Sequence, residues 1–221
     1  MPRATCREIC CTTKLRLSVV SPTPNPSPEG EGSQKVPTPM RIIAGKWRGR
    51  PLKSPPGEST RPTADRVREA LFSMLTSRLG DFDGLRVADL YAGTGALGLE
   101  ALSRGCAHVA FVENERVALD VLKANVAAFG ADRDVSVLAL PVEATPRAAV
   151  PYDVVLLDPP YGEGKALPAL ARLQAQGWLA AHTLVSVETG KAEQLAPPGF
   201  DVDVTRVFGK ARITLLRVSD P

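Results

Sequence analysis

Residues 85–98 read LRVADLYAGTGALG, an apolar run followed by glycines at positions 93, 95 and 98 in the pattern G-x-G-x-x-G. Glycine loops of this pattern turn the chain from a parallel strand into a helix and bring the helix N-terminus close to a ligand. The sequence therefore predicts a strand over residues 85–90, a helix over 96–103 and a binding site where the two meet.

Strands and helices alternate on both sides of this loop. Helical spacing of apolar residues begins after Pro62 and continues to residue 75. Further helices are expected at 115–129 and 165–176, and further strands at 108–113, 135–140, 152–158, 183–188, 202–208 and 213–218. This order predicts an α/β fold, namely a Rossmann-like, doubly wound, mostly parallel seven-stranded sheet that ends in an antiparallel hairpin. Ligands bind beyond the carboxyl ends of the strands in such sheets.

Composition divides the chain into three parts. Residues 1–39 contain seven prolines and little apolar surface to bury, so we expect either a disordered tail or a misassigned start that should be Met40. Residues 40–62 form a basic N-terminal arm, and residues 63–221 form the α/β domain.

Positive charge is concentrated near the arm. Residues 41–68 hold eight basic and two acidic side chains, although the whole chain has a net charge of only +3. This concentration is typical of a surface that contacts a phosphate backbone, and a solvated basic arm with a packed tryptophan is the alternative. Trp47 would offer a stacking surface for an unpaired base. The candidate RNA-binding residues are Arg41, Lys46, Trp47, Arg48, Arg50, Arg61 and Arg66.

Several classes of protein are disfavoured. No apolar run reaches the roughly 18 residues that a membrane span needs. Three of the four cysteines lie within the first eleven residues, and the two histidines, at 108 and 182, are far apart. This distribution fits neither a disulfide framework nor a zinc site. We expect no bound metal, no membrane association and a reducing, cytoplasmic compartment.

The glycine loop alone does not identify its ligand, because nicotinamide enzymes share it. Asp89 ends the preceding strand, where its carboxylate would pair with the ammonium of a methionine moiety but repel a pyrophosphate. Glu113, twenty residues after Gly93, is placed to bind an adenosine ribose. The alternatives are a capping role for Asp89, a solvated turn for Glu113 and a tight turn for Gly93 and Gly95. Glu113 would serve either cofactor, so among these residues it is Asp89 that favours S-adenosylmethionine.

The tetrapeptide DPPY at residues 158–161 follows the apolar run VVLL. Asp158 and the carbonyl of Pro159 can accept hydrogen bonds from an exocyclic amine while charge develops on its nitrogen. Pro159 and Pro160 stiffen the loop, and Tyr161 can stack on an extruded base. A strand-ending turn is the alternative. We interpret these four residues as the catalytic group for methylation of a base amine.

The chain resembles the bacterial small-subunit (16S) ribosomal RNA guanine-N2 methyltransferases in four segments: 40–50 (MRIIAGKWRGR), 61–75 (RPTADRVREALFSML), 89–104 (DLYAGTGALGLEALSR) and 158–161 (DPPY). The resemblance implies a class I methyltransferase fold and S-adenosylmethionine as cofactor, with S-adenosylhomocysteine as product. It also implies that the substrate is one guanine of the small-subunit RNA in a protein-bound assembly intermediate, within the bacterial cytoplasm.

The resemblance also assigns roles to individual positions. It puts Asp89, Tyr91, Gly93 and Gly95 on the cofactor side and makes Glu113 the ribose ligand. Glu143-Ala144 stands where the family usually has Asp-Ala near the adenine amino group, so Glu143 is a weaker match, and an exposed loop glutamate is the alternative.

Three alternatives in function stay open from the sequence. A DNA adenine-N6 methyltransferase would share the fold and the tetrapeptide, but the chain leaves little room for a target-recognition domain. A nicotinamide-dependent oxidoreductase would explain the glycine loop but neither Asp89 nor the DPPY motif. A non-catalytic RNA-binding protein would not need Asp158. Arg66 could contact either the cofactor or RNA, and we expect a monomer.

Overall fold

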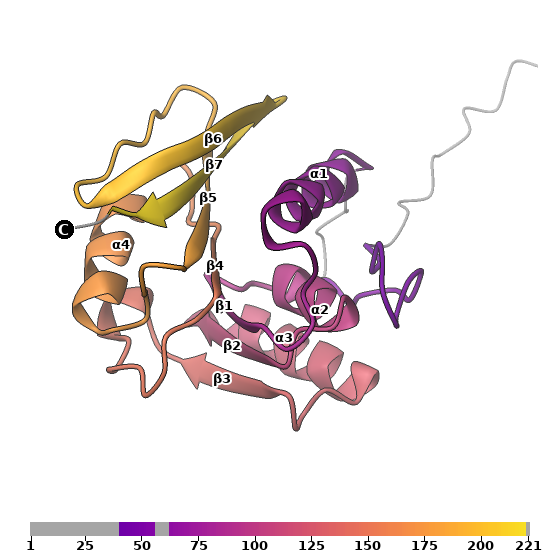
Figure 1. The fold of residues 1–221 in the computed structure, drawn as a ribbon. Coiled ribbons are helices and arrows are strands. Elements are labelled where there is room, and N and C mark those ends of the chain that lie inside the picture. Colours follow the sequence, from indigo (N-terminus) through magenta and orange to yellow (C-terminus); the bar gives the residue numbers. More distant parts are fainter. Residues whose placement is uncertain (1–39, 56–61, 220–221) are drawn as a thin grey trace, which may run out of the picture. The chain divides into compact units, whose positions relative to one another are not determined.

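A seven-stranded sheet forms the centre of the computed structural model, which describes residues 40–55 and 62–219 (Figure 1). The expectations for residues 1–39 and for Arg61 lie outside these ranges. The strands are β1 (Arg86–Leu90), β2 (His108–Glu113), β3 (Val135–Ala139), β4 (Val154–Leu157), β5 (Leu184–Gly190), β6 (Phe200–Phe208) and β7 (Ala211–Val218). The helices are α1 (Pro62–Leu79), α2 (Ala96–Ser103), α3 (Arg116–Phe129) and α4 (Ala166–Ala175), with a 3-10 turn η1 (Val142–Ala144).

The strand order is β3-β2-β1-β4-β5-β7-β6. Strands β1 to β5 pair in parallel, whereas β7 runs antiparallel to both β5 and β6. The chain moves outward from β1 to β3 and then returns to place β4 beside β1. The direction of winding therefore reverses between β1 and β4, and this is the position where open α/β sheets bind ligands.

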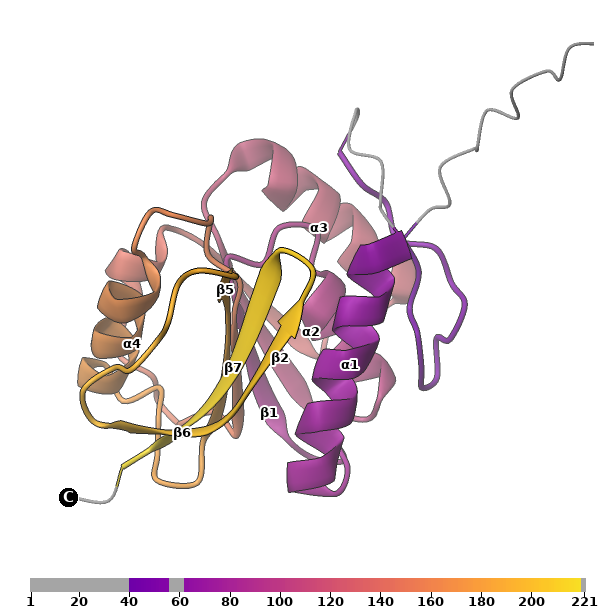
Figure 2. The same cartoon turned by 90° about the horizontal axis from the view of Figure 1, so that it is seen from above.

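Alternate residues of the central strands build two apolar layers. Val87 and Leu156 pack with α1, α2 and α3, whereas Ala88 and Leu157 pack with α4. Figure 2 shows these helices on opposite faces of the sheet. Because both faces are covered, the central strands are mostly apolar between their ends. No helix in the described part of the chain is long and apolar enough to cross a membrane.

The structure confirms the fold expected from the sequence. The predicted helices and strands are present, with ends that differ by a few residues. The strand predicted over 152–158 is shorter, at Val154–Leu157, and both strands of the hairpin begin two residues earlier than expected. The hairpin is inserted in reverse order, since its second strand β7 pairs with β5 and its first strand β6 lies at the edge of the sheet.

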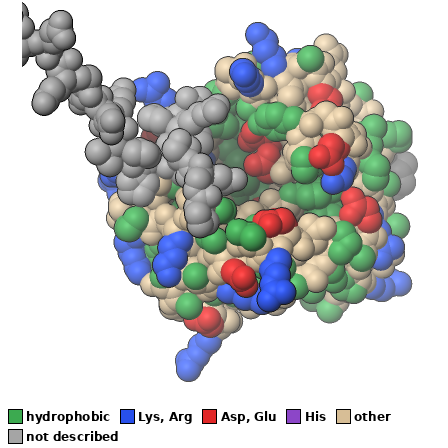
Figure 3. All heavy atoms as spheres, turned by 180° about the vertical axis from the view of Figure 1, so that it is seen from behind, with side chains coloured by type: hydrophobic (Ala, Val, Ile, Leu, Met, Phe, Trp, Pro, Cys, Tyr) green, Lys and Arg blue, Asp and Glu red, His purple; other side chains and the backbone are tan. Residues whose placement is uncertain are grey.

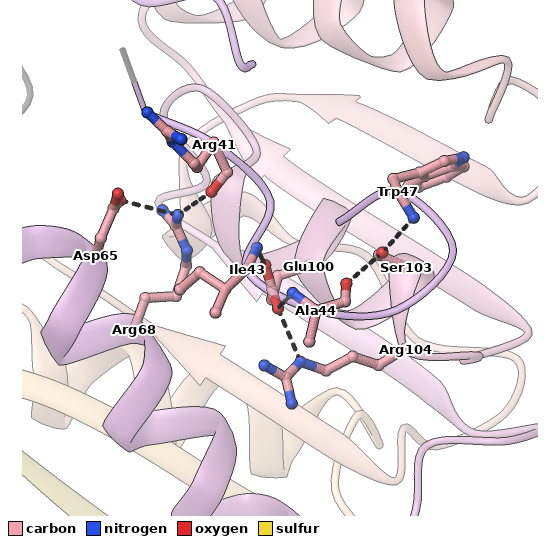
Figure 4. A network of polar contacts seen from close by, with 9 residues as sticks. All are labelled: Arg41, Ile43, Ala44, Trp47, Asp65, Arg68, Glu100, Ser103 and Arg104. Carbon is pink, nitrogen blue, oxygen red and sulfur yellow. Dashed lines mark hydrogen bonds and ion pairs between the residues drawn. The ribbon is translucent and has the colours of Figure 1, made fainter. Parts of the chain in front are cut away.

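The basic segment 40–55 packs against the domain. Ile42 is fully buried and Leu52 nearly so. The Glu100 side chain on α2 is also fully buried, and its carboxylate accepts hydrogen bonds from the backbone N–H groups of Ile43 (2.7 Å) and Ala44 (3.0 Å) and from Arg104 Nε (2.8 Å), as Figure 4 shows. A buried carboxylate is stabilised only when donors surround it in this way. Glu100 therefore fixes the path of the segment.

The turn that follows lies directly on the end of α2. The backbone N–H of Trp47 donates to Ser103 Oγ (2.9 Å), and the backbone N–H of Lys46 donates to the Ser103 carbonyl (2.7 Å). Gly45 adopts φ +82°, and a Cβ atom built there would lie 1.8 Å from that carbonyl oxygen. Only glycine combines this conformation with so close an approach.

A third attachment joins the same segment to the glycine loop. Asn125 on α3 is almost fully buried. Its amide accepts from Lys53 N–H (2.8 Å) and donates to the carbonyls of Lys53 (3.1 Å) and Thr94 (2.9 Å). One side chain thus positions both segments.

Candidate active site

A pocket of about 450 Å³ lies beyond the carboxyl ends of β1, β2 and β4. Figure 3 shows a face of the molecule with a central hollow where acidic and hydrophobic side chains gather, while most lysine and arginine side chains lie toward its edges. Seven predicted site residues line the pocket: Tyr91, Glu113, Glu143, Asp158, Pro159, Pro160 and Tyr161. The fold thus brings together residues up to 70 positions apart in the sequence.

The glycine loop approaches the pocket in a left-handed conformation. Tyr91 has φ 59°, and among the described residues it is the one non-glycine position with positive φ. Gly93 (φ 54°) has open space where a Cβ would lie, whereas a Cβ on Gly95 (φ 78°) would lie 2.3 Å from Leu122 Cδ1. Gly95 therefore permits close packing of the loop on α3, and Gly93 leaves room beside the pocket.

Glu113, at the end of β2, is held rigidly by backbone donors. Its Oε2 accepts from Gly93 N–H (2.8 Å), and its Oε1 accepts from the N–H groups of Asn114 (2.7 Å) and Glu115 (2.8 Å). A carboxylate has about four acceptor positions, so capacity remains for a hydroxyl in the pocket. The contact with Gly93 fixes the geometry of the loop relative to this acid.

Asp89 lies beneath the loop, almost fully buried, and its Oδ2 accepts from Gly98 N–H (2.8 Å). This is the capping contact that the sequence left open as the alternative, and the pairing with an ammonium stays a prediction. Burial, followed by the nearby charges of Asp158 and Glu113, raises the pKa of Asp89 well above its ordinary value. A bound cation at this place would be stabilised by the same carboxylate.

The DPPY loop continues from β4 at the edge of the pocket. Asp158 N–H donates to the Leu90 carbonyl (3.5 Å), which ties the start of the loop to β1. The Asp158 side chain is accessible to solvent from within a concave, protein-lined hollow. Although part of the side chain reaches solvent, the protein atoms around the hollow desolvate its carboxyl group, and this effect, followed by the negative charge of Glu188, raises the pKa of Asp158 to about 7. The carboxylate can therefore change its protonation state near neutral pH.

Tyr161 is 48% exposed and its hydroxyl donates to Glu188 Oε1 on β5. Burial raises the pKa of Glu188 as well, while the bond from Tyr161 opposes that rise. The pKa of Tyr161 is also raised, by desolvation first and then by its bond to Glu188. Two carboxylates and a phenol thus share one corner of the site.

The opposite wall holds Glu143 on η1. Tyr91 Oη lies 3.5 Å from Glu143 Oε1, and burial followed by this acid raises the pKa of Tyr91 to about 12. Lys165 also lines the pocket and forms an ion pair with Glu163 (2.6 Å). In the described residues, no group of three or more His, Cys, Asp or Glu side chains is arranged to hold a metal ion.

The predicted RNA-binding residues that the structure describes, which leave out Arg61, do not line this pocket. Arg41, Arg48 and Arg66 line a second hollow of about 350 Å³ between the basic segment and α1. The Trp47 ring packs on Phe129 with centroids 5.0 Å apart, and Lys46 Nζ lies 4.4 Å from the Trp47 ring centroid.

Arg50 donates to the Ala128 carbonyl (2.6 Å), and its guanidinium lies over the Phe129 ring. The packed tryptophan is therefore what the structure contains at Trp47. Arg48 and Arg66 are exposed.

Comparison with known proteins identifies the family. The family described as conserved hypothetical protein 95 matches residues 40–217. The chain belongs to this family. The Escherichia coli ribosomal RNA small subunit methyltransferase D is 39% identical over 150 residues, which cover 68% of this chain and 74% of that protein. The enzyme of the same name from Haemophilus influenzae is 36% identical over 174 residues, or 75% of this chain and 89% of its own.

Solved structures agree with this family assignment. The Escherichia coli protein yhhF, described as a candidate methyltransferase, matches with a TM-score of 0.72 and 33% identity over 82% of this chain and 99% of its own. A magnesium protoporphyrin IX methyltransferase from Synechocystis with bound S-adenosylmethionine matches with a TM-score of 0.56 at 14% identity, which shows the fold alone.

The family resemblance and the class I methyltransferase fold expected from the sequence are confirmed. The relatives named as ribosomal RNA small subunit methyltransferases support the conclusion that this family member is a methyltransferase that acts on ribosomal RNA.

Sequence reasoning missed three residues that organise the site. Glu188 contacts Tyr161, Asn125 joins the arm to the loop, and Glu100 holds the arm. The sequence could have indicated Glu188, because this acid is the last residue of the strand predicted over 183–188. Acidic residues at that end of a buried parallel strand face the ligand edge of the sheet. The other two lie within helices and have no distinguishing local pattern.

Proposed function

We propose that this chain transfers a methyl group from S-adenosylmethionine to the exocyclic N2 amine of a guanine in small-subunit ribosomal RNA. The observation that carries the proposal is that the DPPY loop and Glu113 line one pocket at the reversal point of the sheet. An amine-binding group and a ribose-binding acid thus border the same space. The relatives named as ribosomal RNA small subunit methyltransferases support RNA as the substrate.

The residues of the pocket fit the cofactor. Its volume of about 450 Å³ lies in the usual range for small-molecule sites. Val112, Leu140 and Val142 offer apolar surface for an adenine ring, and the Glu113 carboxylate offers an acceptor for ribose hydroxyls. When bound, S-adenosylmethionine supplies an electrophilic methyl carbon on a sulfonium, a good leaving group.

The residues of the chain would position and polarise the amine. The Asp158 carboxylate and the Pro159 carbonyl accept hydrogen bonds from the two N–H groups of the amine. These bonds hold the nitrogen in place as its lone pair forms the new N–C bond. S-adenosylmethionine held at Glu113 would supply the methyl group, with S-adenosylhomocysteine as the leaving group, and Asp158 would pass the proton lost from the amine to solvent. Acceptors fixed before the reaction stabilise the developing positive charge without reorganisation. Tyr161 stacks on the base.

Labelled cofactor offered to four substrates tests the proposal: small-subunit particles, naked ribosomal RNA and transfer RNA, each from a strain that lacks the enzyme, and duplex DNA. Digestion and mass spectrometry should identify N2-methylguanosine from particles or ribosomal RNA. A protein-bound assembly intermediate as substrate predicts faster transfer to particles than to naked RNA. Label only in DNA, as N6-methyldeoxyadenosine, would replace this proposal with the DNA-adenine alternative.

Variants of the pocket separate catalysis from binding. Asp158→Ala should abolish turnover and leave the affinity for S-adenosylhomocysteine within a few-fold, because its proposed contacts are to the base. Asp120→Ala, an exposed carboxylate on α3 outside the pocket, serves as the matched control and should keep full turnover. Strong loss of product affinity in Asp158→Ala would contradict its role as the amine acceptor.

The basic surface is tested through salt dependence. Replacing exposed Arg48 and Arg66 by Ala should weaken RNA binding, and each lost phosphate contact should reduce the slope of log K against log salt by about one. Arg206→Ala, on edge strand β6, is the control. An unchanged slope in the double variant would mean that the hollow lined by these residues does not contact RNA.

A further inference from the structure

Asp158 and Glu188 occupy matching positions on neighbouring strands. Leu157 of β4 pairs with Val187 of β5 in parallel register, so the next residue of each strand is an acid. Neighbouring strands lie about 4.8 Å apart, and residues at matching positions point to the same side of the sheet. Asp158 is the first residue after β4 and Glu188 lies within β5, which continues to Gly190, so continuing the register places the two carboxylates side by side.

The Tyr161 hydroxyl orients the second of these acids. It donates to Glu188 Oε1, so the phenol ring and the carboxylate are fixed relative to each other. A carboxylate accepts up to about four hydrogen bonds, so Glu188 retains acceptor capacity while holding Tyr161. Glu188 is not among the residues that line the cofactor pocket, whereas Asp158 and Tyr161 are. The acid pair therefore extends from the pocket toward β5.

We propose that Glu188 selects the base by accepting a hydrogen bond from guanine N1–H while Asp158 and Pro159 hold the N2 amine. The inference rests on the proposed function, and it assigns the choice of base to a residue outside the DPPY motif. The Watson–Crick edge of guanine presents N1–H and the N2 amine as adjacent donors. Two adjacent acceptor groups complement that edge.

Adenine would bind less well to the Asp158 and Glu188 carboxylates. Its N1 is an acceptor with a lone pair, so it would face the Glu188 carboxylate without a hydrogen and would be repelled. A site built from hydrogen-bonding groups rejects a ligand that leaves them unpaired far more strongly than an apolar site does. Burial first, and then the negative charge of Glu188, raise the pKa of Asp158, and donors from guanine would relieve the repulsion between the two carboxylates.

A cycle of one substitution in the protein and one in the substrate tests the contact. Once the methylated guanine has been located, 2-aminopurine is placed there by ligation of synthetic RNA, because this base keeps the N2 amine and lacks N1–H. For the wild-type protein, kcat/KM should fall about 10- to 100-fold from guanine to 2-aminopurine. For Glu188→Ala, kcat/KM on guanine should fall by a similar factor, with less than about a three-fold further loss on 2-aminopurine.

Controls make each outcome decisive. Asp201→Ala removes an exposed carboxylate of β6 and should retain the wild-type penalty for 2-aminopurine. Affinity for S-adenosylhomocysteine reports whether Glu188→Ala is folded, and Glu188→Leu, which fills similar volume and has no acceptor atom, replaces it if it is not. Equal penalties for 2-aminopurine in the wild type and in a folded Glu188 variant would overturn the inference. Failure of the wild type to form N2-methylguanosine would instead refute the proposed function.

Discussion

One of the attachments of the basic segment to α2 is the buried Glu100 carboxylate, and Glu100→Ala should weaken that attachment. The Glu100 side chain has no solvent exposure and accepts from Ile43 N–H, Ala44 N–H and Arg104 Nε. Removing the carboxylate leaves two backbone donors without their partner. It also leaves the Arg104 guanidinium, whose side chain is 18% exposed, without its counter-ion.

The expected loss follows from these contacts. A buried donor without a partner costs about 1–3 kcal/mol, and breaking a buried ion pair by removing one member costs about 3–5 kcal/mol. The contacts share one carboxylate and water can reach part of the space, so we expect a total of about 3–5 kcal/mol. Typical domains have about 5–15 kcal/mol of stability. Glu100→Gln should lose less, about 1–3 kcal/mol, because one acceptor oxygen remains.

Urea unfolding measures the change, with stability taken from linear extrapolation and the m-value checked for constancy. Glu69→Ala, an exposed glutamate on α1, is the matched control and should change stability by less than about 0.5 kcal/mol. Hydrogen exchange should accelerate at the amides of Ile43 and Ala44 in the Glu100→Ala protein and remain slow in the sheet. A loss below about 1 kcal/mol, or unchanged exchange at both amides, would refute the reasoning.

Three further predictions follow from individual contacts. Because the pKa of Asp158 is raised to about 7 and its role requires the charged form, kcat/KM for the RNA substrate should rise about tenfold per pH unit below that value and level off above it. A flat profile from pH 5 to 8 would be inconsistent with this role. Gly45→Ala should lower the free energy of unfolding in urea by at least about 3 kcal/mol, since its Cβ would meet the Ser103 carbonyl. Gly49→Ala, with nearly the same φ but open space, should lower it by about 1–2 kcal/mol. Equal losses would argue against the close approach at Gly45. Burial raises the pKa of Cys106 to about 12. Iodoacetamide at pH 8 should therefore leave the Cys106 peptide unmodified in the native protein and label it in urea. Rapid labelling of the native protein would show that the thiol is accessible.

Composition alone predicts the charge of the basic segment but not its contacts with the domain. Its charge is visible in the sequence and remains exposed at Arg48 and Arg66. Its attachment is not visible, because Glu100 and Ser103 lie more than 50 residues away and have no local signature. A stretch that reads as an arm therefore packs as part of the domain. Trp47 illustrates the same point, since its ring packs on Phe129, which lies on α3.

The glycine loop at residues 85–98 and the periodicity around it determined the fold class. Strand and helix periodicities arise from local geometry, and the loop marks where one becomes the other. The DPPY motif likewise predicts an amine-binding group from four consecutive residues. These signals are local, so the sequence alone carries them.

The tertiary structure alone decided which distant side chains meet. The register of β4 against β5 places Glu188 beside Asp158, and the order of the hairpin places β7 rather than β6 beside β5. Asp89 has the strand-end position expected from the sequence, but only packing directs its carboxylate to Gly98 N–H. Such contacts depend on the path of the chain between the elements, and a local sequence pattern does not specify that path.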